Sequence, residues 1–393
     1  MARPRALLAC PHAWGSVVQV GGHHIARALV AAGWDVAYVS NPISPLHLAG
    51  GLGPELRHRV SIYRRRGIRD ADGHLWAYVP GALLTPRESP ILRSRWVHRN
   101  WVGLSYPNVI RVLRAHGFAS VDLLYFDSVI QSFWLDVLPH RASVLRVGDR
   151  MSGFGQFTEE MRRMQRELAA SVDLVVYSAR DLERDVDAMR PKKTLHLPNG
   201  VDAAHFSEGG GPFPDDLAAI PRPIAVYVGA MEDWFDFDAV SVAAAELPDV
   251  SFVLIGPDRL AMQRLRPQPN LHILGPRPYA QIPRYLHASD VGLIPFDVRG
   301  HAPLVNGVHP LKLYEYMACG LPVVAARWNE LVTLDSPAVL YREPGQLASG
   351  IRAALSEGAA DRAGRVEFAT RADWNERVRT LLSALALAQQ QVS

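Results

Sequence analysis

The sequence predicts an α/β protein made of two Rossmann-like domains, each with a largely parallel sheet. The chain has 393 residues, more than a single hydrophobic core usually covers. In both halves, short apolar runs alternate with amphipathic stretches, which is the pattern of repeated strand–helix–strand units. A stretch rich in glycine and proline at residues 209–223 lies between the halves and indicates a linker.

The composition is that of an ordinary globular protein, with 48% hydrophobic and 21% charged residues. Cys10 and Cys319 are the only cysteines and both lie in apolar runs, which argues against a disulfide framework or a zinc site. No apolar run approaches the ~18 residues needed to cross a bilayer, and ALLAC at residues 6–10 is too short for the core of a signal peptide. We therefore expect a cytoplasmic protein, at most peripheral on the inner face of the plasma membrane.

We expect the N-terminal domain to span residues 1–204. The pattern is less regular at residues 50–117, and elsewhere predicts these elements in order: strand 6–10, loop 11–22, helix 23–32, strand 35–40, strands 121–126 and 143–149, helix 158–171, strand 173–178 and helix 179–189. Ligands of such domains bind at the carboxyl ends of the parallel strands. Residues 11–24 are therefore expected to line a crevice.

The C-terminal domain is expected to span residues 205–369. Its predicted elements are strands 224–231, 251–256, 271–275 and 290–296, followed by a helix and a strand within 309–326. A last helix at 373–389 carries an apolar face formed by Trp374, Val378, Leu381, Leu382 and Leu385. This helix is able to cross back to the N-terminal domain, so we expect residues 370–393 to complete that domain. The cleft between the two domains is the expected site.

The stretch HPLKLYEYMACGLPVVAA, residues 309–326, predicts a short helix that Pro310 starts and Gly320 ends. Lys312 and Glu315 lie three residues apart near the positive end of this helix and so share one face. Lys312 and the free backbone N–H groups would face the phosphates of a nucleoside diphosphate, while Glu315 would accept hydrogen bonds from ribose hydroxyls. An exposed salt bridge between these two side chains is the alternative.

Several motifs of the second half occur together and in a fixed order: PNGVD, YVGAMEDWFD, FVLIG, LGPRPY, SDVGLIPF and HPLKLYEYMACGLPVVA. From residue 197 to 326 the chain thereby resembles the C-terminal halves of GT-B glycosyltransferases of group 1, which are similar to family 4. More narrowly, it resembles the membrane-associated glucuronosyltransferase type of xanthan assembly, through His12 in CPHAW, His23 in GGHHIARAL and Asp149 in LRVGDRMSG. The fold that this implies is GT-B, in which two Rossmann-like domains face a cleft and the C-terminal helix crosses back to the N-terminal domain.

The resemblance implies that the C-terminal domain binds a nucleotide-sugar donor, with a UDP-sugar expected and neither a metal nor another cofactor needed. The implied donor contacts are Lys312 to the diphosphate, Glu315 to the ribose, Gly229 and Met231 in the loop that approaches the donor, and Arg277, Tyr279 and Phe296 around the base. Many retaining members carry a second glutamate eight positions before the ribose glutamate, where this chain has Gly307. This departure favours inverting chemistry.

Inverting transfer needs a base that takes the proton of the acceptor hydroxyl. Asp149 follows a predicted strand and is the first candidate; its alternatives are a cap on the helix near residue 158 or an ion pair with Arg146 or Arg150. His12 is the second candidate for the base. Its alternative role is to position another group through a hydrogen bond. His23, His24 and Arg150 are expected on the acceptor side.

Three aspartates, Asp233, Asp236 and Asp238, suggest either a metal site or an acidic loop that caps a helix, and the loop is favoured.

Arginines dominate residues 55–114, where Glu55, Asp70, Asp72 and Glu88 are the only acidic residues. Within this segment, a membrane patch is predicted that consists of Arg93, Arg95, Trp96, Arg99 and Trp101. Arginines with interleaved tryptophans suit an interfacial helix on anionic lipid. A solvated surface is the alternative, and nucleic acid is disfavoured because no motif for it accompanies the charge.

Together these patterns predict a glycosyltransferase with Asp149 as general base. It would move a sugar, for which glucuronic acid is one candidate, from a nucleoside-diphosphate sugar to a lipid-linked or other glycan. Two other functions remain open. One is a nucleotide-sugar epimerase of the same fold, which would convert a UDP-sugar without an acceptor. The other is a catalytically silent subunit that binds a sugar nucleotide or glycan, in which Asp149→Asn would leave function intact.

Overall fold

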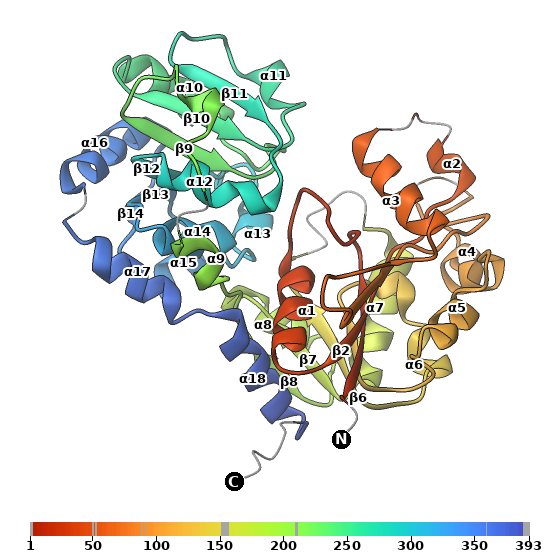
Figure 1. Cartoon of the computed structure of the whole chain (residues 1–393). Helices are drawn as coiled ribbons and strands as arrows, with labels where there is room; N and C mark the ends of the chain where they lie inside the picture. Colours follow the sequence, from red (N-terminus) through yellow and green to blue (C-terminus); the bar gives the residue numbers. More distant parts are fainter. Residues whose placement is uncertain are drawn as a thin grey trace. The chain divides into compact units, whose positions relative to one another are not determined.

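The computed structural model describes residues 3–48, 51, 53–87, 89, 91–150, 157–208, 211–358 and 360–387 (Figure 1). The chain divides into two compact units. Unit 1 comprises the residues up to Pro198 and those from Asn375 onward, and unit 2 comprises Asn199–Trp374. The sequence placed the corresponding boundaries at residues 204/205 and 369/370. Both units are α/β with mainly parallel sheets, which confirms the predicted fold class.

Unit 1 is built on one sheet with the strand order β3-β4-β2-β1-β5-β6-β7-β8 in the described part of the chain. All neighbouring strands pair in parallel except β3 and β4. The strands are β1 (Arg5–Cys10), β2 (Asp35–Ser40), β3 (Ile68–Arg69), β4 (Leu75–Tyr78), β5 (Val121–Phe126), β6 (His140–Val147), β7 (Leu174–Tyr177) and β8 (Thr194–His196). Its helices are α1 (Gly21–Ala31), α2 (Pro45–Leu48), α3 (Pro54–Arg64), α4 (Arg95–Asn100), α5 (Val109–Ala115), α6 (Trp134–Val137), α7 (Glu159–Ser171), α8 (Glu183–Asp187) and, from residue 375, α18 (Trp374–Ala384).

The unit 1 sheet is covered on both faces, which is why its central strands are almost wholly apolar. Ala9 belongs to the core that also contains Val112 of α5, Trp134 of α6 and Leu168 of α7. Cys10 points to the opposite face because side chains alternate along a strand. On that face a Cβ at Gly22 would lie 2.9 Å from Cys10 Sγ, so α1 packs there.

Unit 2 contains the sheet β11-β10-β9-β12-β13-β14, in which neighbouring strands pair in parallel. The strands are β9 (Ile224–Val228), β10 (Ser251–Ile255), β11 (Leu271–Gly275), β12 (Val291–Ile294), β13 (Val323–Ala326) and β14 (Val339–Tyr341). The helices are α9 (Ala203–Ser207), α10 (Phe237–Glu246), α11 (Ala261–Arg264), α12 (Ile282–His287), α13 (Ala302–Val305), α14 (Leu311–Ala318), α15 (Asn329–Thr333), α16 (Leu347–Glu357) and α17 (Arg362–Thr370).

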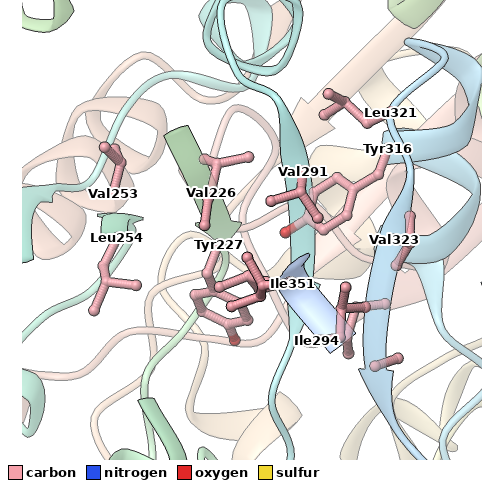
Figure 2. Close-up of a cluster of buried hydrophobic side chains, with 14 of the residues drawn as sticks. Val226, Tyr227, Val253, Leu254, Val291, Ile294, Tyr316, Leu321, Val323 and Ile351 are labelled. Carbon is pink, nitrogen blue, oxygen red and sulfur yellow. The ribbon is translucent and has the colours of Figure 1, made fainter. Parts of the chain in front are cut away.

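Helices α14 and α16 cover opposite faces of the unit 2 sheet. A Cβ at Gly292 would lie 2.4 Å from the Tyr316 ring of α14, and a Cβ at Gly350 of α16 would lie 2.9 Å from Val324 Cγ1. Gly292 pairs with Val323, the neighbour of Val324, so the two contacts fall on alternate faces. Figure 2 shows Tyr316 among the apolar side chains of this sheet.

The predicted elements agree with the structure except at some ends. Strand β6 begins at His140, earlier than predicted, and ends at Val147. The predicted helix 179–189 is a 3-10 turn, Arg180–Leu182, followed by the short α8. It stops early because Arg190 has φ +55 and a proline follows at position 191. The predicted end of the last helix at residue 389 lies outside the described residues.

Candidate functional site

Helix α14 is fixed to the sheet of unit 2 by one of its own side chains. The hydroxyl of Tyr316 accepts a hydrogen bond of 2.8 Å from the backbone N–H of Val228, the last residue of β9. The ring of the same tyrosine occupies the space that a side chain at Gly292 of β12 would need. Gly320 ends the helix with φ +80, as predicted. The first turn of α14 is therefore held in register with the carboxyl end of β9.

Lys312 lies on the same face of α14 as Tyr316, because the two residues are four apart. Its Nζ atom is 5.5 Å from the ring centroid of Tyr227 and 5.7 Å from that of Phe296, both within cation–π range. Gly229 has φ +149, and a Cβ there would lie 2.4 Å from Lys312 Cε. The sequence predicted Lys312, Gly229 and Phe296 as donor contacts, and the structure brings these three together at the ends of β9 and β12.

Glu315 is the second polar group of α14 at this place. Burial raises the pKa of Glu315 to about 7, and the charge of Lys312 acts in the opposite direction. The residue as a whole is of intermediate exposure. The carboxyl group is therefore protonated at higher pH than an ordinary glutamate, and in its protonated form it donates as well as accepts hydrogen bonds.

The loop after β9 is anchored through its backbone. The N–H of Gly229 donates to Ile255 O at 2.8 Å, and the N–H of Met231 donates to Pro257 O at 3.3 Å. The side chain of Met231 is 1% exposed and belongs to the core. Because its side chain is buried, Met231 is able to contact a ligand only through its backbone.

Arg277 and Tyr279 contact other parts of unit 2. The Arg277 guanidinium pairs with Asp216 at 2.7 Å and donates to the Tyr285 hydroxyl at 3.0 Å, and these bonds raise its pKa. The Tyr279 ring stacks on His205 of α9, with centroids 4.6 Å apart and planes 17° apart. These contacts stabilise the packing of α9 and α12. The predicted role of Arg277 and Tyr279 around a nucleotide base therefore rests on the resemblance alone.

The aspartates of the loop before α10 have helix-capping and ion-pairing partners. Asp236 Oδ1 accepts from the N–H of Ala239 at 2.8 Å and so caps α10. Asp233 pairs with Arg264 at 2.5 Å. Within the described ranges, no group of three or more His, Cys, Asp or Glu side chains is placed to hold a metal ion.

In unit 1, His12 lies two residues beyond β1, and the residue as a whole is exposed. His23, by contrast, is fully buried at the start of α1. Its Nδ1 accepts from the N–H of Val20 at 3.2 Å, so Nε2 carries the proton and donates to Ala13 O at 3.0 Å. Burial lowers the pKa of His23 to about 4, which leaves the ring neutral. His24 is also buried, with 2% exposure. Contact of His23 with an acceptor would require these backbone bonds to break.

Asp149 and Arg150 follow the end of β6, as predicted, and both are partly exposed. The Arg150 guanidinium pairs with Asp181 at 2.9 Å and with Asp185 at 2.7 Å, so it ties the segment after β6 to α8. The alternative in which Asp149 caps the next helix does not hold, because Thr158 accepts from the N–H of Met161 and caps α7.

The structure adds a buried ion pair that the sequence analysis did not assign. Arg146 of β6 and Asp127, directly after β5, are 3.0 Å apart, with side chains 9% and 8% exposed. Burial acts to lower the pKa of Arg146, but Asp127, Tyr125 and Asp149 offset it and the pKa is raised. An arginine in the middle of the apolar run SVLRV was the available signal, since a charge in a buried strand needs a partner.

The predicted membrane patch is only partly a surface. Arg93, Arg95 and Trp96 are exposed, with Trp96 at 57%. Arg99 is exposed but pairs with Glu160 and Glu167 of α7. The prediction was wrong for Trp101. Its side chain is fully buried, and its indole N–H donates to Ile130 O at 2.8 Å. Trp101 is buried because the chain turns inward after the short α4.

Two family models match the chain. Residues 8–178 match the N-terminal domain of glucuronosyltransferase GumK, and residues 222–357 match the glycosyl transferases of group 1. Among curated proteins, the putative teichuronic acid biosynthesis glycosyltransferase TuaH of Bacillus subtilis (strain 168) is 27% identical over 234 residues, which is 57% of this chain. The match spans 56% of the length of that relative.

Solved structures resemble the chain over nearly its whole length. HepE of Anabaena, in complex with UDP and glucose, has a TM-score of 0.64 and 16% identity, over 97% of this chain and 100% of that one. Sucrose-phosphate synthase of Thermosynechococcus elongatus has a TM-score of 0.61 and 18% identity, over 98% and 97%. These likenesses confirm the predicted two-domain GT-B fold.

Proposed function

We propose that this chain, a GT-B glycosyltransferase whose residues 222–357 match the group 1 family model, transfers a sugar from a nucleoside-diphosphate sugar to a glycan acceptor. The observation that carries the proposal is the place of Lys312. A cation on the first turn of α14 is held against Gly229 at the end of β9, where parallel α/β sheets bind ligands. Phosphate oxygens suit both this cation and the free N–H groups of the helix.

The donor is proposed to be a UDP-sugar, with glucuronic acid as a candidate sugar. Support comes from the N-terminal match to a glucuronosyltransferase model and from structural neighbours that were solved with UDP and with UDP-glucose. Glu315 is one helical turn from Lys312 and is proposed to bind the ribose hydroxyls, with Phe296 near the base. No metal ion is needed in this scheme, because Lys312 supplies the positive charge opposite the diphosphate.

In the proposed reaction, the acceptor oxygen attacks the anomeric carbon while its proton passes to a base. Asp149 is the proposed base, and His12 is the second group able to take this proton. The bond between the anomeric carbon and the phosphate oxygen breaks, and its electron pair leaves with the diphosphate, whose charge Lys312 stabilises. Gly307 stands where many retaining relatives carry a glutamate, which supports a single inverting displacement.

The acceptor is proposed to be a lipid-linked glycan, reached from the cytoplasmic face of a membrane. Arg93, Arg95 and Trp96 offer exposed charge and an exposed ring, and Ile91, which is close to them in sequence, is 74% exposed. Such a surface suits the headgroup layer of anionic lipid. In the described part of the chain, no helix has the length and apolarity to span a bilayer.

A thermal-shift and turnover assay tests the proposal. A ligand that binds only the folded chain raises Tm, so UDP and UDP-sugars should raise it while ribose phosphate should not. UDP release should then depend on added lipid-linked glycan. Absence of a shift with every nucleoside diphosphate would sink the donor assignment. Conversion of the UDP-sugar without an acceptor would support an epimerase instead.

A further inference from the structure

The loop before α14 is held by two side chains from distant parts of unit 2. Trp328, which lies between β13 and α15, donates its indole N–H to Val308 O at 3.0 Å. Asn199, the first residue of unit 2, donates its side-chain amide to His309 O at 2.9 Å. Trp328 and Asn199 are both buried. Pro310 is the N-cap of α14, so these two bonds fix the carbonyl groups of the two residues directly before the helix cap.

Trp328 also contacts the surroundings of Lys312. The Trp328 ring centroid is 5.5 Å from that of Phe296, and the Phe296 centroid is 5.7 Å from Lys312 Nζ. The residue after Trp328, Asn329, donates its backbone N–H to Asn306 Oδ1 at 3.0 Å and so holds the start of the loop. This short segment therefore fixes both the loop before α14 and an aromatic neighbour of the cation.

The side chain of His309 joins the same loop to α14. Its ring is fully buried and stacks on the ring of Tyr314, with centroids 5.5 Å apart and planes 13° apart. The Tyr314 hydroxyl and His309 Nε2 also form a hydrogen bond of 3.3 Å. A shift of the His309 backbone would therefore displace α14, and Lys312 with it.

We propose that Trp328 and Asn199 are positioning residues that hold the first turn of α14, with Lys312, in the arrangement that binds the donor diphosphate. A carbonyl oxygen carries partial negative charge and repels a phosphate that it faces. The carbonyls of Val308 and His309 point to buried donors instead, and both bonds must break before either carbonyl turns. The proposal rests on the proposed function, because it requires a nucleoside diphosphate at Lys312. Neither positioning residue would touch the donor.

Affinities for UDP and for uridine, measured by calorimetry on the whole chain, test the proposal. Trp328→Phe and Asn199→Leu each remove one donor and keep a side chain of similar shape. In both variants the affinity for UDP should fall about threefold to tenfold, while that for uridine, which has no phosphate, stays within about twofold of the wild type. Trp101→Phe and Asn270→Leu are matched controls, because each removes the same kind of donor to a backbone carbonyl of another loop and should leave the ratio of the two affinities unchanged. An unchanged ratio in either Trp328→Phe or Asn199→Leu overturns the proposal.

Loss of a buried donor leaves a carbonyl without its partner and is a risk to folding, so hydrogen exchange on the wild type provides a test that needs no variant. UDP should slow amide exchange in peptides that cover residues 197–201 and 327–330 as well as 306–313, because the two bonds tie these segments to the loop. Uridine should slow exchange in none of the three. Protection by UDP that is confined to 306–313 overturns this proposal and leaves the proposed function intact. A wild type that binds UDP no more tightly than uridine contradicts both.

Discussion

Gly229 and Lys312 fit against each other so closely that a Cβ at position 229 would lie 2.4 Å from Lys312 Cε and 2.8 Å from Nζ. Contacts this short do not occur in real structures. Lys312 is able to occupy this position only because residue 229 has no side chain. The backbone of Gly229, with φ +149, is also one that side-chain-bearing residues rarely adopt. Loop and helix are therefore matched to each other at the candidate phosphate site.

Gly229→Ala should displace Lys312 and strain the loop. We expect Tm to fall by several degrees, corresponding to about 1–3 kcal/mol, together with a loss of UDP affinity. Gly345→Ala is the matched control in the same unit, because a Cβ there meets nothing within 4 Å. Equal Tm and equal UDP affinity in the two variants would contradict this account of the loop.

Lys312→Met keeps an apolar chain near the rings of Tyr227 and Phe296 but removes the charge. UDP affinity measured by calorimetry should fall about tenfold or more, since a charge-assisted contact to phosphate contributes about 1.5–3 kcal/mol. Lys193→Met, a lysine of unit 1 whose Nζ donates to Ala384 O, serves as the control. Unchanged UDP affinity in Lys312→Met would remove this residue from the donor site.

Glu315→Gln should change how stability depends on pH. An acid whose pKa rises on folding, here from 4.5 to about 7, binds more protons in the folded chain than in the unfolded one. The free energy of unfolding of the wild type should therefore fall as pH rises through this window. The variant lacks this loss and should gain on the order of 2 kcal/mol relative to the wild type above pH 7, with little gain below pH 4.5. Urea unfolding across this range checks the slope, with the exposed Glu246→Gln as the control.

Asp149→Asn keeps the shape of the proposed base but removes its ability to take a proton. Turnover should fall by about a hundredfold or more, while UDP binding to unit 2 stays unchanged. Steady-state kinetics and calorimetry on the same preparation separate these effects. A variant with wild-type turnover would shift the role of base to another group, and His12 is the first to examine.

A triple variant tests the surface of unit 1, with Arg93 and Arg95 changed to Gln and Trp96 changed to Ser. Cosedimentation with vesicles that contain anionic lipid should decrease, because charge attraction and ring insertion are both lost. Arg371→Gln with Arg379→Gln removes two exposed arginines elsewhere and should leave cosedimentation unchanged. Equal binding by the two variants would return this surface to the solvated alternative.

Much of the fold could be predicted because its main cues are local. Apolar runs such as VDLLYF and SFVLI, bounded by turns, are the strands β5 and β10 with the predicted limits or nearly so. In α14, Gly320 predicted where the helix ends. The spacing of Lys312 and Glu315 predicted which face of the helix is polar. Such features depend on neighbouring residues only.

The rest of the site depends on contacts between residues that are distant in sequence. Asp127 and Arg146 meet only because β5 and β6 are neighbours in the sheet, so the sequence showed two charges without showing a pair. Trp101 appeared equivalent to Trp96, yet only the path of the chain after α4 decides that one is buried and the other exposed. Arg277 likewise meets Asp216 across 61 positions.

The contact between Gly292 and Tyr316 restricts how related chains are able to diverge. A side chain at 292 would overlap the tyrosine ring, and loss of the tyrosine would leave the N–H of Val228 without its hydroxyl acceptor. Single changes at either position should therefore be selected against, whereas a larger residue at 292 combined with a smaller one at 316 restores the volume. We expect these two positions to covary among family members, and the tyrosine–glycine combination to identify those that share this attachment of α14 to the sheet.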